Sequence, residues 1–520
     1  MSKSRDNVDT LDNLPGPGGS ALVGFVQSGS GAIARTMQDK ARDIVSVKDF
    51  GATGDSSTDD TTNFNAAIAA CKLSGAALYV PDGTYKITSS LTTITGQFTM
   101  YGDGPFKSRI QFAPTANDTL LELSNGASRA EHVVLRDFAM YSTDTTYTKI
   151  AMDVYDLSQC VFERLFIHGT GMASGPGAGA GWSDGSATSI GIRTHGREAT
   201  GLSDISIFAD KPIVIAANPN TDADDGEDMD HWNWQNLYLV GNGNPLISVD
   251  TGLGVNETVF GGYQAWVGGT VGCKINDTRA APVVPSRGIE FFNVRREQGT
   301  SASDYVFDLT FTVPVQQITF DKVLMAAGTK GIKLDGFSRA VLDQVTAAMT
   351  STDALTVANV TASSVLVFRG CIWQSGATVT TTGLTQIHSQ AYRSASFSAP
   401  SDAVYAGQIT DTQFNVAKAR ITAANAGVGF VITGTTGDGL QMLPQAAGSG
   451  VVVRAVNNAE SDFEPLTLLG ETVEIRYRTG VATSAVAATI NSDGTVTFAS
   501  LAGTGSRTVV ADANGKISAP

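Results

Sequence analysis

Leu135-Arg136-Asp137-Phe138 is the first of eight similar tetrads that recur along the middle of this chain. Each tetrad begins and ends with an apolar, aromatic or cysteine residue, and its two middle residues are mostly polar or small. The other seven are Phe162-Glu163-Arg164-Leu165, Leu202-Ser203-Asp204-Ile205, Trp234-Gln235-Asn236-Leu237, Phe291-Phe292-Asn293-Val294, Phe320-Asp321-Lys322-Val323, Leu342-Asp343-Gln344-Val345 and Phe368-Arg369-Gly370-Cys371. Their third positions are separated by 27, 40, 32, 57, 29, 22 and 26 residues, spacings typical of a solenoid.

Alignment of the tetrads on the third position shows where the chain bends. The residues four and two before that position, and those one and three after it, are apolar. Side chains of a strand alternate between two faces. Because the apolar residues lie at even offsets before the third position and at odd offsets after it, two successive residues must point outward at the tetrad. The pattern therefore predicts an all-β chain whose centre is a right-handed parallel β-helix with stacked turns. The 57-residue gap predicts one more turn around Val259-Phe260-Gly261-Gly262-Tyr263.

Composition agrees with a β-rich protein and limits its partners. Only 16% of the 520 residues are charged, and 56 are glycine. The formal net charge of -15 argues against binding nucleic acid or an anionic membrane surface. No apolar run has the length of a membrane span, and Met1 to Asp12 is too polar for a signal peptide, so we expect a soluble chain made without the secretory route.

Neither cysteines nor histidines suggest a metal site. Cys71, Cys160, Cys273 and Cys371 lie far apart without a zinc or disulfide pattern, and Cys160 and Cys371 fall in apolar columns. We therefore expect no disulfides and buried thiols at Cys160 and Cys371, and the five histidines show no ligand spacing. No cofactor is expected.

Three regions follow from the pattern: residues 1–44, the β-helix over 45–390, and a β-sandwich-like region over 391–520. A short helix is expected from 32 to 44, and another from Thr61, where Phe64, Ala67, Ile68 and Cys71 form a buried stripe that closes the first turn. The pattern fades after Gly376. Asp493-Gly494 and Asn514-Gly515 predict hairpins in the last region.

The start of the β-helix resembles a known family. Val45-Ser46-Val47-Lys48-Asp49-Phe50-Gly51-Ala52-Thr53-Gly54-Asp55, followed by Thr58-Asp59-Asp60 and Val80-Pro81-Asp82-Gly83-Thr84-Tyr85, is similar to the first turn of the pectate-lyase-like β-helix. Gly24-Phe25-Val26-Gln27-Ser28-Gly29 and Ala34-Arg35-Thr36-Met37-Gln38-Asp39-Lys40 resemble the neck that precedes it in bacteriophage tailspikes. Ser56 departs from the usual glycine of the family.

The resemblance implies a homotrimeric spike of the phage virion. Such a spike is assembled in the host cytoplasm and acts at the bacterial surface, where it binds a polysaccharide and usually cleaves it. Residues 1–44 would attach it to other tail or baseplate proteins, and residues 391–520 would form trimer or receptor contacts. The family does not transfer its catalytic residues, because these differ from spike to spike.

Candidate catalytic acids come from the expected outer face. Glu290 and Asp321 lie one turn and two residues apart, which puts their α-carbons about 8 Å apart and suits an inverting glycosidase. Glu297, flanked by Arg295 and Arg296, is the second choice, and solvated acids without a role remain the simple alternative. Phe292, Gln235 and Tyr238 are expected nearby as sugar-binding residues.

Two further residues lie in unusual contexts. Arg296 falls in an inward column, so we expect either a β-bulge that turns it outward or an acid beside it. Trp182, in a Gly-rich loop, is expected to be exposed and to grip a sugar or pack on a neighbouring subunit.

Three interpretations of the acidic stretch from Asp222 to Trp232 stay open. It could be a solvated loop, a calcium-binding loop that matches the known pattern poorly, or a loop that brings Asp228 or Asp230 to the groove beside Trp232.

Three functions remain open. The first is an endoglycosidase that degrades capsule or O-antigen with two acids. The second is a polysaccharide lyase in which Arg295 or Arg296 neutralises a uronic carboxylate. The third is an adhesin that binds without cleavage.

Overall fold

The computed structural model describes residues 16, 18–124, 130–155, 157–169, 182, 188–195, 197–198, 201–217, 229–241, 244–280, 282, 284–297, 305–326, 330–348, 353–361 and 363–373, and the strands given below that follow Trp373. It divides into two compact units, Met1–Ile409 and Thr410–Pro520. The predicted region boundaries at 44 and 390 stay predictions.

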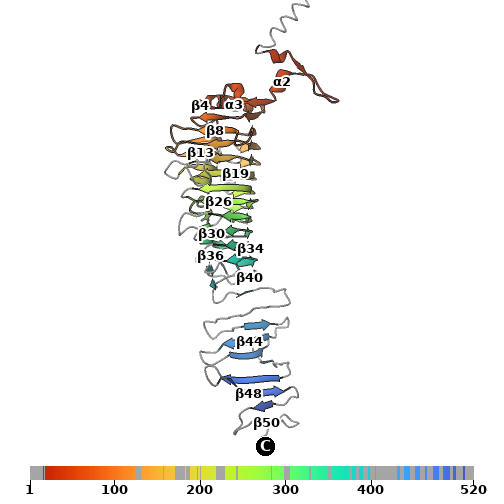
Figure 1. Ribbon diagram of the computed structural model, residues 1–520, viewed down its shortest axis with the longest axis vertical. Coiled ribbons are helices and arrows are strands. Elements are labelled where there is room, and N and C mark those ends of the chain that lie inside the picture. The colour runs from red at the N-terminus through yellow and green to blue at the C-terminus, as the bar shows by residue number, and fades with distance from the viewer. Residues whose placement is uncertain are drawn as a thin grey trace, which may run out of the picture. The chain divides into compact units, whose positions relative to one another are not determined.

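The first unit consists of strands stacked along one axis (Figure 1). Among the described residues, helical elements occur only near its start: η1 (Gly19–Ala21), α2 (Met37–Ala41), η2 (Val47–Phe50) and α3 (Thr61–Ser74). Before these stacked turns, β1 (Gly24–Phe25) pairs antiparallel with β2 (Arg35–Thr36). The helix expected over 32–44 is therefore shorter than predicted.

One long sheet contains the tetrads, and all its pairings are parallel. Strands that precede the tetrad corner, or run through it, are β3 (Ile44–Ser46), β5 (Ala77–Val80), β7 (Phe98–Gly102), β11 (Val133–Arg136), β15 (Val161–Glu163), β19 (Gly201–Ala209), β22 (Asn233–Gly241), β25 (Val259–Gly261), β28 (Ile289–Phe292), β31 (Ile318–Asp321), β34 (Arg339–Asp343), β37 (Val365–Arg369), β40 (Gln386–Gln390) and β42 (Val404–Tyr405). Strands beyond the corner are β4 (Asp55–Asp59), β6 (Gly83–Ile87), β8 (Ser108–Phe112), β12 (Ala139–Tyr141), β16 (Phe166–His168), β26 (Gln264–Gly268), β29 (Val294–Arg296), β32 (Leu324–Met325), β35 (Thr346–Ala347) and β38 (Ile372–Trp373).

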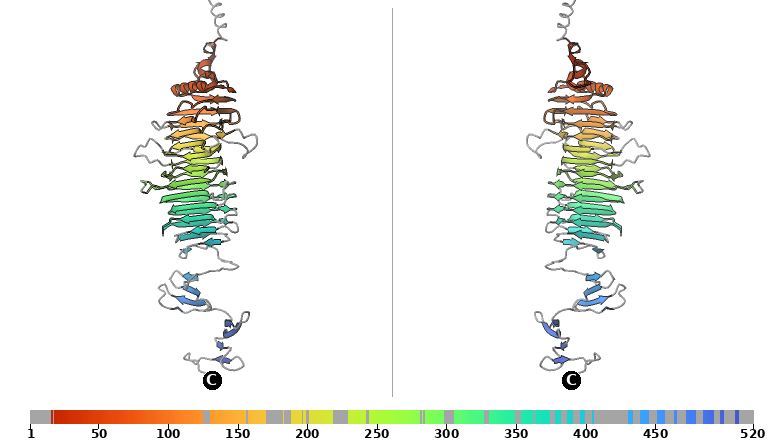
Figure 2. Two further views of the ribbon diagram at one scale, coloured as in Figure 1. Left: turned by 90° about the vertical axis from the view of Figure 1, so that its left-hand side faces the viewer. Right: turned by 90° about the vertical axis from the view of Figure 1, so that its right-hand side faces the viewer.

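The second long sheet supplies one strand to almost every turn, again in parallel order. Its strands are β9 (Asp118–Leu123), β13 (Lys149–Tyr155), β17 (Ile190–His195), β20 (Lys211–Ile215), β23 (Ile247–Val249), β27 (Cys273–Asp277), β30 (Tyr305–Val315), β33 (Lys330–Phe337), β36 (Asp353–Ala358), β39 (Thr378–Thr381) and β41 (Ser396–Ser398). Short strands add two small ladders, β10 (Ala130–Glu131) with β14 (Leu157–Ser158), and β18 (Arg197–Glu198), β21 (Met229–Asp230) and β24 (Val255–Asn256). Side views show the two long sheets forming the sides of the same coil (Figure 2).

Stacking of the tetrads is confirmed residue by residue. Leu135 lies opposite Phe162, Phe162 opposite Leu202, and Leu202 opposite Trp234. The series continues through Phe260, Phe291, Phe320, Leu342 and Phe368. The hidden turn at Val259–Gly261 is thus present, and the all-β parallel helix predicted from the sequence is confirmed.

A left-handed residue makes each corner. At all nine third positions, including that of the hidden turn, φ lies between 47° and 65°: Asp137, Arg164, Asp204, Asn236, Gly262, Asn293, Lys322, Gln344 and Gly370. This conformation turns the strand and places two successive side chains outward. A second corner has the same conformation at His132, Gln159, His231, Glu257 and Gly288.

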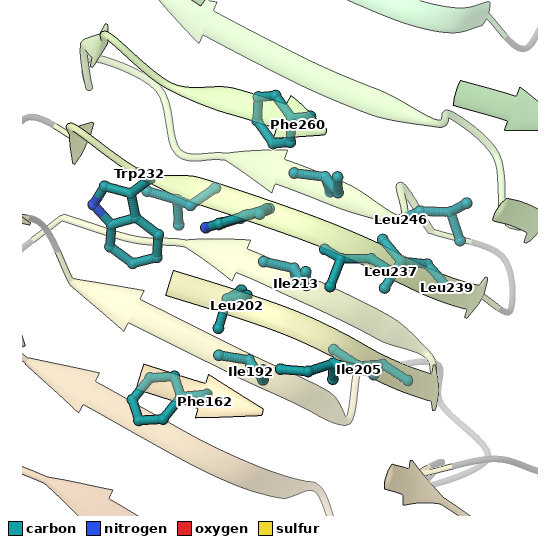
Figure 3. Packing of buried hydrophobic residues seen from close by; sticks show 14 of the residues in the cluster. Phe162, Ile192, Leu202, Ile205, Ile213, Trp232, Leu237, Leu239, Leu246 and Phe260 are labelled. Carbon is teal, nitrogen blue, oxygen red and sulfur yellow. The ribbon is translucent and has the colours of Figure 1, made fainter. Parts of the chain in front are cut away.

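The interior is filled by the inward columns of both sheets (Figure 3). Phe260, Phe291 and Phe320 stack from turn to turn, with ring centroids 4.7 and 5.3 Å apart. All four cysteines are free and buried, which confirms the prediction for Cys71, Cys160 and Cys371.

The predicted helix from Thr61 is confirmed, with Phe64, Ala67, Ile68 and Cys71 buried and Gly75 ending it at φ 74°. The coil also continues past the point where the sequence pattern fades, because β40 pairs with β42.

The second unit contains two antiparallel sheets. They are formed by β43 (Phe430–Thr433), β44 (Gly439–Pro444), β45 (Val451–Val456) and β46 (Phe463–Glu464), and by β47 (Thr472–Arg478), β48 (Ser484–Asn491), β49 (Val496–Phe498) and β50 (Arg507–Val509). β48 pairs antiparallel with β49, and the turn predicted between them at Asp493-Gly494 lies outside the described residues. The turn predicted at Asn514-Gly515 and the loop from Asp222 to Asp228 lie outside the described residues.

Candidate functional site

Three predicted residues lie on the outer side of the strands that precede the corner. Phe292 on β28 is opposite Asp321 on β31, and Asp321 is opposite Asp343 on β34. Glu290 lies two residues before Phe292, opposite Thr319. Phe292, Asp321, Asp343 and Glu290 are all half-buried, which leaves their outer atoms accessible. The predicted spacing of Glu290 and Asp321, one turn and two residues, is present.

Asp321 differs from the other predicted acids in its electrostatics. Burial raises its pKa, and the neighbouring Asp343 raises it further, whereas the ammonium of Lys322 lowers it. A carboxyl that keeps its proton longer than usual is suited to donate it to a leaving group. Asp343 was not predicted as part of the site, although its place in the same column as Asp321 was the available signal.

Phe292 is oriented outward but one face of its ring is already occupied. The Lys322 ammonium lies 4.9 Å from the ring centroid, a cation–π contact. Gln235 also faces outward, and it packs over Gly261 of the next turn, where a Cβ would lie 2.5 Å from Gln235 Nε2. These two positions therefore contribute polar and aromatic surface to the same column.

A second group lies beyond the corner. Arg295 Nε contacts Glu297 Oε1 at 2.9 Å, and both side chains are exposed by 40% or more. Tyr238 lies two turns from Arg295 in the same column, with Ala265 between them. Burial raises the pKa of Tyr238, and the charges of Glu297 and Tyr263 raise it further. Glu297, Arg295 and Tyr238 are thus brought together as predicted.

An aromatic row extends from Tyr238 across the outer side of the same sheet. The ring centroids of Tyr238 and Phe208 are 5.4 Å apart, those of Phe208 and Phe166 5.7 Å, and those of Phe166 and Phe106 5.7 Å. Phe106 is 73% exposed. This row was not predicted from the sequence, although Phe166 and Tyr238 both stand two residues after a corner.

Two tryptophans expected to contact sugar are inside the protein. Trp182 is fully buried and stacks on Phe112 at 6.0 Å, so the expectation of an exposed Trp182 is wrong. Trp232 is also buried, among the core residues of Figure 3 and at 5.5 Å from Trp234, so its predicted place beside a groove is wrong. In both cases a large apolar surface next to a strand is more stable in the core than in water.

Arg296 stays in its inward column, so the predicted bulge is wrong. It pairs in regular register between Trp266 and Met325 and is 1% exposed. Its Nη2 donates to the carbonyl oxygen of Gly269 at 3.0 Å. The turn at Gly268 and Gly269, both with left-handed φ, brings this acceptor inside the coil. A role for Arg296 in substrate binding is therefore not supported.

Asp230 lies at the second corner rather than in the column of Asp321. Its Oδ1 is 2.9 Å from His231 Nδ1, and His231 Nε2 is 2.7 Å from Glu257 Oε2. Glu257 also contacts Arg287 at 3.4 Å. This surface ladder connects three successive turns and gives Asp230 a structural partner.

The described residues contain neither a candidate metal centre nor a helix that could span a membrane. No group of three or more His, Cys, Asp and Glu side chains is arranged for a metal ion in this part of the chain. Within the same residues, every helix is too short or too polar to cross a membrane.

Part of the chain is similar to a known protein family. Residues 44–197 match the family model described as Rhamnogalacturonase A/epimerase, pectate lyase-like. The chain therefore forms a parallel β-helix whose first turns are similar to the pectate-lyase-like family.

The resemblance to bacteriophage tailspikes, expected from residues 20–90, is also confirmed. The tail spike protein of an Escherichia phage is 46% identical over 71 residues, 14% of this chain and 8% of that protein. The pre-neck appendage protein of a Bacillus phage is 34% identical over 98 residues, 18% of this chain and 11% of that protein. The match thus spans only a small part of either relative.

A similar fold occurs in tailspike protein 3 of bacteriophage CBA120. The TM-score is 0.45 at 14% identity, over 86% of this chain and 76% of that one.

Proposed function

We propose that this chain is a bacteriophage tailspike that binds a bacterial surface polysaccharide, either capsule or O-antigen, and hydrolyses it as an endoglycosidase. The observation that carries the proposal is Asp321, an outward acid with a raised pKa between two further outward carboxylates. Glycoside hydrolysis needs such a pair, one acid that holds a proton and one that is ionised. The tail-spike and pectate-lyase-like matches support a glycan as the substrate class.

In this proposal Asp321 protonates the glycosidic oxygen. Its partner is either Glu290 or Asp343, and the two choices predict different stereochemistry. Residues opposite each other on parallel strands have α-carbons about 4.8 Å apart, so two Asp side chains that extend side by side would place their carboxyl groups near the separation of retaining enzymes. Glu290 is displaced by one strand and two residues, about 8 Å, which leaves room for the water of an inverting enzyme.

Tyr238, Arg295, Phe106 and Phe208 supply the binding surface, with Phe166 packed behind the two Phe rings. Aromatic faces pack against sugar rings, and the Arg295 guanidinium hydrogen-bonds hydroxyl or carboxylate groups. Glu297, whose Oε1 contacts Arg295 Nε at 2.9 Å, is the alternative acid.

Site-directed variants of the full-length protein test the proposal on purified bacterial polysaccharides. Asp321→Asn is expected to lower the release of reducing ends by about 10²- to 10⁴-fold, because the proton donor is lost. Glu290→Gln and Asp343→Asn identify the partner, and nuclear magnetic resonance of the first product shows retention or inversion. Asp335→Asn on β33 is the matched control, because it makes the same acid-to-amide change at a half-buried residue of the second long sheet. Unchanged activity in Asp321→Asn contradicts the proposed role.

Product analysis separates the alternatives. A lyase with Arg295 as the group that neutralises a uronic carboxylate gives unsaturated uronic acids that absorb in the ultraviolet, and a hydrolase does not. An adhesin binds the polysaccharide and releases no product, with or without the acids.

The same proposal gives the chain its partners. Three copies form the spike, and residues 1–44 attach it to other tail or baseplate proteins of the virion. It is assembled in the host cytoplasm and acts at the bacterial surface.

A further inference from the structure

The side chain of Lys322 covers one face of the Phe292 ring. Phe292 on β28 lies opposite Asp321 on β31, and Lys322 follows Asp321 at the corner, where its φ is 53°. The corner turns two successive side chains outward, so the carboxyl of Asp321 and the ammonium of Lys322 share the outer side of the coil with the ring. The ammonium lies 4.9 Å from the ring centroid, although the residue is exposed.

This contact is one that a ligand can replace. In the described part of the chain, no hydrogen bond or ion pair holds the Lys322 ammonium in addition to the contact with the ring. An exposed ammonium gains little from an aromatic face, because water solvates the charge nearly as well. A sugar ring uses the same kind of surface, since its apolar side packs against aromatic faces. Lys322 and a sugar therefore compete for one face of Phe292.

The same ammonium acts on the carboxyl of Asp321. Burial raises the pKa of Asp321, Lys322 lowers it, and Asp343 on the next strand raises it. The other acid near this carboxyl, Glu290, lies diagonally across on β28, opposite Thr319. If the ammonium moved away, the effects of burial and of Asp343 would remain, and both favour the protonated acid.

We propose that Lys322 is a gate on the Phe292 ring: its ammonium covers the ring in the free protein, and a sugar that stacks on the ring displaces it from Phe292 and from Asp321. The inference rests on the proposed function for the sugar and for Asp321 as proton donor. Displacement removes the cation that opposes protonation of Asp321. The acid therefore holds its proton more firmly once the substrate is in place.

Binding to the full-length protein tests the competition. A panel of purified capsule and O-antigen polysaccharides is measured with Asp321→Asn, so that the polymer stays intact. Addition of Lys322→Asn is expected to tighten binding about twofold to fivefold, the value of an exposed cation–π contact. Asparagine suits this corner, because Asn236 and Asn293 occupy the same position of other turns with φ of 55° and 56°. A lysine that hydrogen-bonds the sugar would give the opposite result, a loss of affinity.

Three variants control for other effects. Phe292→Leu removes the ring, so the further change Lys322→Asn should bring no gain in affinity. Lys322→Arg keeps a cation over the ring, so it should bring no gain either. Arg164→Asn removes the cation of another corner, where φ is 47°, and its affinity is expected to equal that of the unchanged protein. Thermal unfolding of each variant shows whether a change in binding reflects a change in structure.

The pH dependence of cleavage tests the effect on Asp321. The basic limb of kcat/KM reports the proton donor of the free protein, and that of kcat reports the donor with substrate bound. Lys322→Asn is therefore expected to move the limb of kcat/KM to higher pH and to leave the limb of kcat in place. A limb of kcat/KM that does not move would contradict the effect of Lys322 on the acid.

Several results would overturn the inference: no binding to any polymer of the panel, equal or weaker binding with Lys322→Asn, or a gain that persists without the Phe292 ring. Cleavage that depends on Asp321, together with unchanged affinity in Lys322→Asn, would overturn the gate while supporting the proposed function. Conversely, a gain that requires the ring, in a protein that still cleaves with Asp321→Asn, supports the competition and contradicts the proposed proton donor.

Discussion

The corner residue of each turn is in the left-handed conformation, which costs an L-residue with a side chain about 1–2 kcal/mol. The chain places Asp, Asn, Gly, Arg, Lys and Gln at these positions. Two of them, Gly262 and Gly370, have almost equal φ values of 65° and 58° but different surroundings. A Cβ at Gly262 would lie 2.4 Å from Asn236 Oδ1, whereas at Gly370 its nearest neighbour is Gln344 Cγ at 3.7 Å.

This difference predicts unequal effects of the same substitution. Gly370→Ala is expected to lower the free energy of unfolding by about 1 kcal/mol, the cost of the left-handed backbone alone. Gly262→Ala is expected to lower it by a further amount of about 1–3 kcal/mol, because Asn236 must move. Denaturant unfolding of the two variants measures both values, and equal losses would contradict the predicted contact.

Burial of Trp182 leads to a second prediction. Trp182→Ala is expected to lower the free energy of unfolding by about 3–5 kcal/mol, because it leaves a cavity beside Phe112. Tyr263→Ala, at a side chain that is 48% exposed, is the control and is expected to change it by no more than about 0.5 kcal/mol. If Trp182→Ala instead left stability unchanged and reduced polysaccharide binding, the exposed position expected from the sequence would be right.

At the scale of the elements, ion pairs connect successive turns across the corner. Arg164 on the turn of β15 donates to Asp137 on the turn of β11, with Nε–Oδ1 at 2.6 Å and Nη2–Oδ2 at 3.0 Å. These hydrogen bonds hold the pKa of Asp137 below its usual range. A group with a lowered folded-state pKa stabilises the protein above its unfolded pKa and loses that contribution as pH falls through the folded value.

Arg164→Met is therefore expected to destabilise the protein at pH 7 by about 0.2–1 kcal/mol, the range of partly exposed ion pairs. The difference from the unchanged protein should vanish at pH values below the folded pKa of Asp137, once this carboxyl is protonated in both states. Arg369→Met is the matched control, because its guanidinium lies 3.8 Å from Asp343 and makes a weaker pair. A loss for Arg164→Met that persists unchanged in acid would show that the effect comes from packing.

The residues that lie opposite each other in successive turns could be predicted on the inner side of the coil but not on its outer side. The inward columns could be read from the tetrads because every turn repeats the same apolar positions. The partners on the outer side could not, because turn lengths vary between 22 and 40 residues and outward positions tolerate any polar residue. Asp343 and the Phe106–Phe166–Phe208 row became visible only once the register was known.

At the scale of the whole molecule, the tailspike resemblance predicts a trimer. Sedimentation of the full-length protein is expected to give three times the chain mass of 54.1 kDa. A monomer at micromolar concentration would contradict the predicted spike. Deletion of 410–520, the second compact unit, tests whether that part carries the trimer contacts, in which case the remaining chain sediments as a monomer.

The amino-acid sequence by itself determined the coil, its corners, the hidden turn near Gly262, the helix from Thr61 and the first-turn family motif. These features repeat or are local, so the apolar positions and turn residues suffice to predict them. Only the tertiary structure decided that Trp182 and Trp232 are buried, that Arg296 stays inside, and that the Lys322 ammonium lies over the Phe292 ring. Each of these outcomes depends on which residues of successive turns lie opposite each other, and loops of unequal length hide that register from the sequence.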